Sequence, residues 1–306
     1  SVESALKVIS MAEEIAGGRE ELRERPIISF ITSWMKSPLQ LDDSTTLILM
    51  RIAKEGIPVA LSAAPMAGST SPVTLAGTLA QVNAEQLSGI VLTQSINPGA
   101  PVIYGAIPTV TDMRTMAFLD GAIELGILEA ACAQLAQYYN LPFYAWGGLT
   151  DSKIPDIQAG YEKGTTLLMT ALAGANYIHN SAGMLESTTT VAYEQYVIDN
   201  EIIGMVMRAL KGIEVNEDTL ALDLIDKVGP GGNFLAEEHT VSHMRSEFFF
   251  PRVSDRSQRE KWLSEGGKDA RERAREIAKD ILAKHKPLPI PSDIDKIIKN
   301  SVKGLL

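Results

Sequence analysis

Residues 141–180 read LPFYAWGGLTDSKIPDIQAGYEKGTTLLMTALAGANYIHN and predict the repeating unit of the fold. The runs 141–146 and 175–179 are short, apolar and rich in aromatic residues, which is typical of strands. Between them, Pro155 begins a helical segment, and Gly174 is a typical C-terminal cap. A strand, a helix and a second strand in this order predict two parallel strands with the helix packed against them.

Three similar runs precede this unit, at residues 26–31, 58–63 and 89–93. Their starts are 32 and 31 residues apart, which is the size of one strand–helix–strand repeat. Ser71 and Pro72 begin the helix that we expect before the third run, and Ser88 and Gly89 end it. The five runs together predict a parallel sheet that is covered by helices on both faces.

Residues 102–106 also have strand character, but only a short segment separates them from the run 89–93. A crossover between parallel strands needs roughly ten residues or more. We therefore interpret residues 97–111 as an excursion beyond the carboxyl end of a strand. Excursions of this kind build the active sites of α/β barrels.

After Thr188 the pattern is helical, and amphipathic segments cover residues 191–209, 218–228, 237–246, 268–285 and 292–302. We expect an α/β barrel portion at 1–187 and a C-terminal helical wrap at 188–306, packed on the barrel within the same domain. Five strands are too few for a closed parallel (β/α)8 barrel of the TIM type. Either further strands precede Ser1, or the sheet is open and doubly wound.

The composition excludes several classes of protein. The 306 residues are 45% apolar and carry a formal net charge of −10, which argues against nucleic-acid binding. The charge is compatible with a cationic ligand, although it commonly serves only solubility. No apolar run of about 18 residues is present, so no membrane-spanning helix is expected. Because Cys132 is the only cysteine and the N-terminus has no signal-peptide pattern, we expect a cytoplasmic protein without disulfides.

Several common motifs are incomplete. Residues 229–233 (GPGGN) lack the lysine and hydroxyl of a phosphate loop, and no G-x-S-x-G elbow is present. His239 and His243 share one helix face, but the general-base glutamate of a zinc protease is missing. A hydrogen-bonded structural pair is therefore favoured over a metal site. Lys153 is interpreted as part of a loop ion pair in preference to a Schiff-base lysine.

The predicted strand ends carry aromatic, amide and imidazole side chains. In an α/β barrel the ligand binds at the carboxyl ends of the strands. The candidates for substrate binding there are Trp34, Gln94, Tyr104, Trp146, His179 and Asn180. Uncharged aromatic walls hold a quaternary ammonium group by cation–π attraction of roughly 0.5–2 kcal/mol per ring. The alternative for Trp34 and Trp146 is an ordinary place in the core.

Three parts of the chain resemble the trimethylamine methyltransferase family. They are the excursion at 97–105 (NPGAPVIYG), the turn and helix at 147–153 (GGLTDSK) and 156–160 (DIQAG), and the C-terminal block at 229–245 (GPGGNFLAEEHTVSHMR). The resemblance extends over essentially the whole chain, and family members are longer at the N-terminus. It therefore favours a barrel whose first strands precede Ser1.

The resemblance implies a TIM barrel that passes a methyl group from an amine to the Co(I) of cobalamin on a separate corrinoid protein. Trimethylamine-specific members carry pyrrolysine in or near the region that matches 146–153, where this sequence has only standard residues. The chain thus resembles a relative without pyrrolysine that demethylates a quaternary amine such as glycine betaine and has no tightly bound cofactor. We expect Trp34, Tyr104 and Trp146 to form a cage, with Gln94, His179 and Asn180 at the polar end of the substrate.

Other interpretations stay open. If Lys153 or a neighbour stands for pyrrolysine, the substrate is trimethylamine. A non-catalytic betaine-binding barrel would hold the amine without transferring its methyl group. A lyase or aldolase of the same fold would need Lys153 or a metal. The sequence is compatible with a homo-oligomer.

Overall fold

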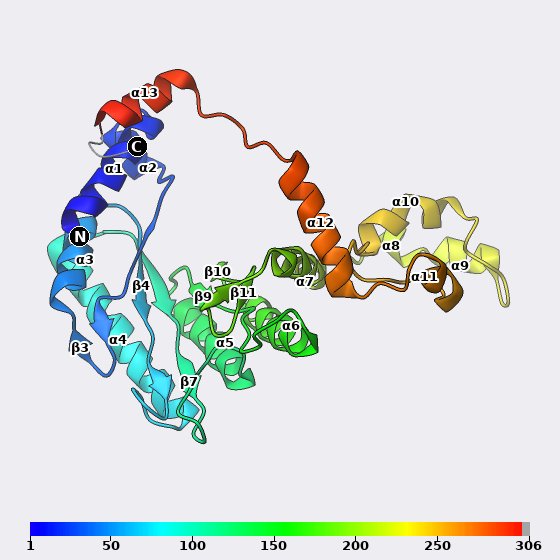
Figure 1. Ribbon diagram of the computed structural model, residues 1–306, viewed down its shortest axis with the longest axis horizontal. Coiled ribbons are helices and arrows are strands. Elements are labelled where there is room, and N and C mark those ends of the chain that lie inside the picture. The colour runs from blue at the N-terminus through cyan, green and yellow to red at the C-terminus, as the bar shows by residue number, and fades with distance from the viewer. Residues whose placement is uncertain (302–306) are drawn as a thin grey trace.

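A computed structural model describes residues 1–301 (Figure 1). Its main strands are β1 (Phe30–Thr32), β4 (Val59–Ala63), β6 (Val102–Ala106), β9 (Tyr144–Trp146) and β10 (Tyr177–His179). They pair in parallel, β1 with β4, β4 with β6, and β9 with β10. A parallel bridge between Tyr104 and Phe143 joins β6 to the segment before β9. The strands therefore follow chain order, without the reversal that a doubly wound sheet requires.

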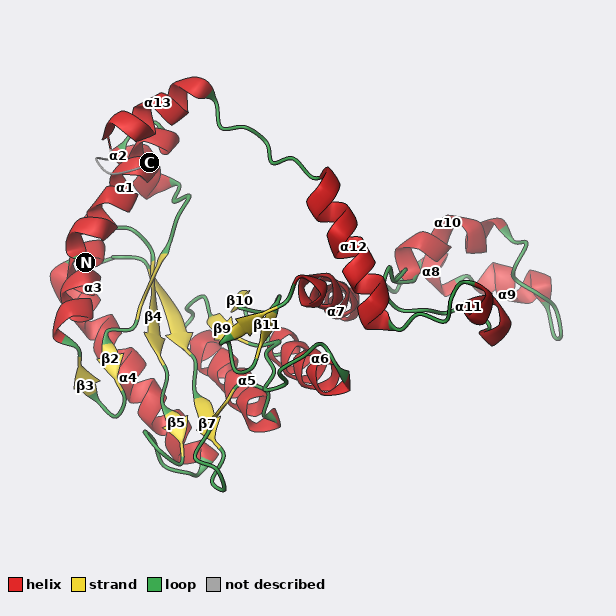
Figure 2. Cartoon of the chain, in the orientation of Figure 1, coloured by secondary structure: helices red, strands yellow, loops and turns green. Residues whose placement is uncertain are grey.

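One helix follows each of these strands before the next one begins. They are α3 (Asp43–Glu55) after β1, α4 (Leu75–Ile96) after β4, α5 (Ile123–Tyr138) after β6 and α6 (Ile157–Leu172) after β9. Apolar side chains from these helices, such as Leu49 and Cys132, are buried against Leu61 and Ala145 of the strands. On the opposite face Tyr177 is exposed. The helices thus cover one face of the strands (Figure 2), and within the described residues the strands do not close into a barrel.

The other elements are shorter strands and flanking helices. The strands are β2 (Met35–Lys36), β3 (Gln40–Leu41), β5 (Met66–Ala67), β7 (Thr109–Thr111), β8 (Phe118–Leu119), β11 (Met184–Leu185) and β12 (Thr190–Val191). The helices are α1 (Val2–Ala16), α2 (Arg19–Glu24), α7 (Tyr193–Lys211), α8 (Glu217–Leu220), α9 (Leu222–Val228), α10 (Glu238–Glu247), α11 (Arg259–Ser264), α12 (Ala270–Lys284) and α13 (Ser292–Ser301). Within residues 1–301, no helix is both long and apolar enough to cross a membrane.

The prediction of a strand at 89–93 is wrong, because this run is the end of the long helix α4. Its buried residues Gln86, Gly89 and Thr93 recur every three or four positions, which is the period of a helix face. A short apolar run does not distinguish a strand from a buried helix segment by periodicity. The interpretation of 97–111 as an excursion is therefore also wrong. Residues 102–106 form the strand β6, and α4 provides the crossover length that a parallel pair needs.

The helix predicted between 155 and 174 is confirmed. Asp156 caps α6, because its carboxylate accepts a hydrogen bond from the Ala159 amide at 3.0 Å. Within residues 1–301, the expectation that strands end before Thr188 fails only for β12, which pairs with β11 in a small hairpin. The predicted C-terminal helices are present, although 218–228 is divided into α8 and α9. Val302, the expected end of the last helix, lies outside the described residues.

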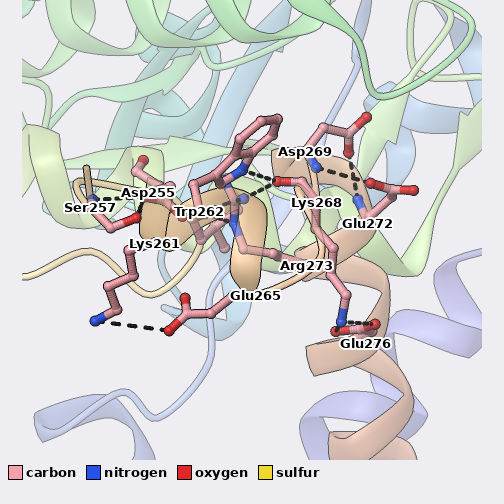
Figure 3. Close-up of polar contacts among 12 residues, drawn as sticks. Asp255, Ser257, Lys261, Trp262, Glu265, Lys268, Asp269, Glu272, Arg273 and Glu276 are labelled. Atoms are coloured by element: carbon pink, nitrogen blue, oxygen red, sulfur yellow. Dashed lines mark hydrogen bonds and ion pairs between the residues drawn. The ribbon is translucent and has the colours of Figure 1, made fainter. Parts of the chain in front are cut away.

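The C-terminal helices are attached at separate places. Helix α12 packs on α7, where Arg271 and Arg275 form ion pairs with Glu194. The turn into α12 is held by the Lys268 carbonyl, which accepts hydrogen bonds from Trp262 and Arg273 (Figure 3). Helix α13 returns to pack against α1, whereas α8 to α11 project away from the strands (Figure 1). Of the C-terminal helices, α7 thus contacts α6, α12 contacts α7, and α13 contacts α1.

Candidate functional site

The carboxyl ends of β9 and β10 bring together four ring side chains. Trp146 and His179 are register partners in the parallel pair, and so are Tyr144 and Tyr177 two residues earlier. Because side chains alternate along a strand, all four lie on the same face. The intervening Ala145 packs in the core on the helix side. The four rings therefore lie on the face that the helices leave uncovered.

These rings and Phe118 from β8 form what we call the aromatic cluster. The ring centroids of Tyr144 and Tyr177 are 5.5 Å apart, and those of Tyr144 and His179 are 5.3 Å apart. Trp146 and Phe118 are in contact at 6.4 Å. These separations are within the range of favourable aromatic pairs. Tyr177 remains 59% exposed, so the cluster is open to a ligand on one side.

The cluster is electrically neutral and has free polar atoms. The Tyr144 hydroxyl and His179 Nδ1 share a short hydrogen bond. Burial lowers the pKa of His179 below its ordinary value of 6.5, so the imidazole is uncharged at pH 7. The Trp146 indole N–H is buried and has no hydrogen-bond partner among the described residues. A neutral aromatic face with an unused donor suits an organic cation that also carries an acceptor group.

The turns after β9 and β10 are held together behind the cluster. The Ser181 hydroxyl donates to the Gly147 carbonyl at 3.0 Å. Asn180 and Gly148 both have a positive φ, 60° and 72° respectively. At Gly148 an added Cβ would also lie 3.2 Å from the Ser181 side chain, so both backbone conformation and space favour glycine. Asn180 thus follows His179 directly in a tight turn at the strand end.

A buried ion pair fixes these turns to the helices. The Lys163 ammonium of α6 contacts an Asp199 carboxylate oxygen of α7 at 3.2 Å, and both side chains are 1% exposed. The same ammonium donates to the carbonyls of Gly148 at 2.7 Å and Met184 at 3.0 Å. Burial lowers the pKa of Lys163 and raises that of Asp199 to about 6. One cation therefore connects the loops that follow both strands.

Two acidic residues, Asp120 and Asp151, lie close together beside the same loops. The Asp151 carboxylate accepts hydrogen bonds from the backbone amides of Asp120 and Gly121, at 2.8 and 3.1 Å, and from the Ser187 hydroxyl at 2.7 Å. Asp120 is fully buried, and neither of its oxygens has a hydrogen-bond partner within residues 1–301. Burial and the neighbouring Asp151 raise the pKa of Asp120 to about 7. Asp120 is thus partly protonated at neutral pH.

The structure does not bring the other predicted site residues to this cluster. Trp34 is fully buried beneath α4, with its ring directly over Gly89. Tyr104 faces the same helix, where its hydroxyl donates to Asn83 Oδ1 at 3.1 Å. Gln94 belongs to the end of α4 and closes the following turn by bonds to the Gly99 amide and the Ala100 carbonyl. Trp146, His179 and Asn180 lie together, whereas Trp34, Gln94 and Tyr104 lie on the helix side.

Three residues of the cluster, Tyr144, Tyr177 and Phe118, were not predicted from the sequence. Tyr144 and Tyr177 each precede a candidate by two positions, so strand alternation places them on the same face as Trp146 and His179. That alternation was a usable signal. Phe118 comes from a separate short strand, and no local pattern connects it with β9.

Lys153 and the histidine pair lie outside the cluster. Lys153 is exposed, and its ammonium donates to the Asp151 carbonyl at 2.8 Å, which is a loop contact. His239 and His243 stack on one face of α10, with ring centroids 4.1 Å apart. With Asp218 they form the group that could hold a metal ion within the described residues. That group belongs to the projecting helices, away from the strand ends (Figure 1).

The fold and the site define an α/β protein of successive strand–helix units with a neutral aromatic site at the carboxyl ends of parallel strands. The chain belongs to the trimethylamine methyltransferase family, because the sequence model of the family described as "Trimethylamine methyltransferase (MTTB)" matches residues 1–303. The family resemblance inferred from the sequence is thereby confirmed.

The chain is similar both to trimethylamine methyltransferases and to a glycine betaine methyltransferase. The chain is 46% identical to trimethylamine methyltransferase MttB of Desulfitobacterium hafniense (strain DSM 10664 / DCB-2), over 97% of this chain and 59% of the relative. It is 41% identical to glycine betaine methyltransferase of Desulfitobacterium hafniense (strain Y51), over 96% and 61%. It is 45% identical to MttB of Methanosarcina barkeri (strain Fusaro / DSM 804), over 92% and 56%. The chain thus spans less than two thirds of the length of these relatives.

Proposed function

We propose that this protein transfers a methyl group from a quaternary amine, of which glycine betaine is the first candidate, to the Co(I) of a corrinoid carried by a partner protein. Membership of the family supports methyl transfer as the reaction. The relative named as a glycine betaine methyltransferase supports the substrate class. The neutral aromatic cluster at the ends of β9 and β10 is the observation that carries the proposal.

The cluster suits the cationic end of such a substrate. The exposed ring of Tyr177 and the half-buried ring of Trp146 present π-faces, each of which attracts a quaternary ammonium by roughly 0.5–2 kcal/mol, and the buried Tyr144 packs behind Tyr177. The neutral His179 does not repel the cation, since burial lowers its pKa. At the other end, the free indole N–H of Trp146 and the amide of Asn180 are donors for a carboxylate. Trp34, Gln94 and Tyr104 are not included, because they face the helices.

The proposed reaction requires neither an acid nor a nucleophile from the protein itself. A quaternary ammonium releases a neutral tertiary amine, which keeps the electron pair of the broken C–N bond, so no acid is needed. The Co(I) of the corrinoid supplies the nucleophile when the partner is bound. The only cysteine, Cys132, is buried on the helix side, and burial raises the pKa of its thiol, so it is not placed to accept the methyl group. The residues of the cluster bind and orient the amine and exclude water.

We also propose that the five parallel strands are part of a (β/α)8 barrel. Their order, their parallel pairing and the helices on one face support this, and so does the resemblance to the family. Residues 1–187 would form the barrel portion, and 188–306 the helices attached to it. The binding groups would then lie at the barrel mouth, where ligands of this fold bind.

Two alternatives remain for the substrate and the activity. The relative named trimethylamine methyltransferase is 46% identical, which supports trimethylamine as the rival substrate. A barrel that binds betaine without catalysis is the second alternative.

The test is a methyl-transfer assay with free cob(I)alamin and the purified protein, with glycine betaine, choline and trimethylamine offered separately. We expect methylcobalamin and a tertiary amine from a quaternary substrate, and none from trimethylamine. Consumption of trimethylamine alone would establish the rival substrate. Calorimetric binding of betaine without any methyl transfer would establish the non-catalytic alternative.

A further inference from the structure

The projecting helices α8, α9 and α10 lack a hydrophobic core of their own. None of the residues in these three helices is buried, and apolar side chains such as Leu222 and Val241 are exposed. Small modules of this kind are usually stabilised by a disulfide, a metal or a partner. Cys132 is the only cysteine and lies in α5, so a disulfide is excluded. A metal or a partner is therefore the kind of support that these helices need.

Three potential ligands meet between α8 and α10. His239 and His243 are four residues apart on α10, and Asp218 comes from α8, more than twenty residues earlier in the chain. One ligand atom from each lies within 4.8 Å of the other two. His243 Nε2 is 3.0 Å from an Asp218 carboxylate oxygen, and His239 Nε2 is 3.1 Å from the Asp218 carbonyl. Both Nε2 atoms are thus directed at the same residue of the other helix.

The surroundings orient one of these rings as a metal ligand requires. His243 Nδ1 is 2.9 Å from the His239 backbone carbonyl, an acceptor that fixes the proton on Nδ1. Metal-binding histidines commonly donate the other ring N–H to a carbonyl in this way, which leaves Nε2 free for the metal. The stacked rings also share one face of the helix. Beside His239 lies an open cavity of about 580 Å³, lined also by Glu217 and Asp223, with room for a water as a further ligand.

We propose that Asp218, His239 and His243 bind a zinc ion that joins α8 to α10. Two imidazoles and a carboxylate are ligands typical of Zn²⁺, whereas Ca²⁺ and Mg²⁺ prefer oxygen ligands alone. On binding, the metal takes the place of the proton between His243 Nε2 and Asp218, and that proton is released to solvent. His239 gives up its hydrogen bond to the Asp218 carbonyl, and its ring proton moves to Nδ1, so that Nε2 can bind the metal. The site lies apart from the aromatic cluster, so the test of zinc binding does not depend on the proposed methyl transfer.

The experiment measures zinc binding to the whole chain after removal of metals with a chelator. Calorimetry with Zn²⁺ should give one strong site per chain, and Zn²⁺ should raise the melting temperature, whereas Mg²⁺ and Ca²⁺ should do neither. His239→Gln and His243→Gln should each weaken zinc binding more than tenfold. His285→Gln, which removes an exposed histidine at the end of α12, is the matched control and should bind as the parent does.

The alternative is a hydrogen-bonded structural pair. In that case the parent protein would show no strong site, or the two histidine variants would bind zinc as tightly as His285→Gln. Either result overturns the proposal. Should a glutamine variant fail to fold, the Co²⁺-loaded parent decides the question. A tetrahedral cobalt spectrum that stoichiometric Zn²⁺ removes supports the site, and the lack of such a spectrum overturns it.

Discussion

Gly89→Ala tests whether Trp34 is a core residue beneath α4. Gly89 lies inside this helix, where alanine is ordinarily preferred to glycine by about 1 kcal/mol. At this position, however, the added Cβ would lie 2.2 Å from Trp34 Nε1 and within 2.5 Å of two further ring atoms. Trp34 is fully buried, so its ring has no free space to move into. The helix preference and the packing therefore act in opposite directions.

The magnitudes decide the outcome. Inserting a methyl group into a well-packed core costs about 1–3 kcal/mol, and a separation this short belongs to the upper part of that range. After the gain of about 1 kcal/mol in helix preference, we expect a net loss on the order of 1–2 kcal/mol in urea unfolding. Gly164→Ala in α6 is the matched control, because a Cβ there meets nothing within 4 Å. It should stabilise the protein by about 0.5–1 kcal/mol.

A rescue variant completes the experiment. Trp34→Phe removes the ring atoms that a Cβ at position 89 would meet, so the double variant should lose less stability than the sum of the two single changes. If Gly89→Ala proves as stabilising as Gly164→Ala, then Trp34 does not pack against α4. Trp34 would then again be a candidate for the aromatic cage that the sequence predicts.

Three further predictions concern the site and its support. Lys163→Met should lower the free energy of unfolding in urea by about 3–5 kcal/mol, because Asp199 is left as an unpaired buried charge. The control Lys153→Met in the exposed loop should lower it by less than about 0.5 kcal/mol, and equal losses in the two variants would contradict the prediction. Since the folded pKa of Asp120 is raised to about 7, the protonated form stabilises the fold at low pH, and this stability is lost as pH rises from about 4 to 7. Asp120→Asn should therefore raise the free energy of unfolding at pH 8 far more than at pH 4, and an equal effect at both values would refute the assignment. Trp146→Ala should weaken calorimetric binding of glycine betaine about two- to thirtyfold, and Trp146→Phe should weaken it less; unchanged affinity in Trp146→Ala would remove this ring from the site.

The alternation of strands and helices could be predicted from the sequence where the two differ in length and where capping, proline or glycine residues mark their ends. Four of the five predicted strands overlap β1, β4, β9 and β10. The failure at 89–93 has a physical cause, because a buried helix end and a short strand are both continuous apolar runs. That error also led to the wrong interpretation of β6. Too few residues separate the wrongly predicted strand at 89–93 from β6 for a parallel crossover, so residues 102–106 were not predicted as a strand of the sheet.

The same reasoning placed half of the predicted site residues at the carboxyl ends of β9 and β10. Trp146 and His179 could be found because they end strands that were correctly placed. Tyr104 could not be placed correctly, since an aromatic residue in a strand faces either the helices or the open side, and only the register decides which. The buried pair of Lys163 and Asp199 was not predicted at all. It joins residues of two different helices, and nothing local to either one indicates the partner.

That ion pair gives the aromatic cluster its fixed geometry. An apolar side chain at position 163 would fill the same volume, but it would leave the carbonyls of Gly148 and Met184 without a donor in a buried place. The ammonium satisfies both, and it thereby sets the distance between the turns that follow β9 and β10. Trp146 and His179 stand immediately before those turns, so their spacing depends on the same cation. The proposed methyl transfer depends on aiming one methyl group, so it would need this rigidity more than an additional catalytic group.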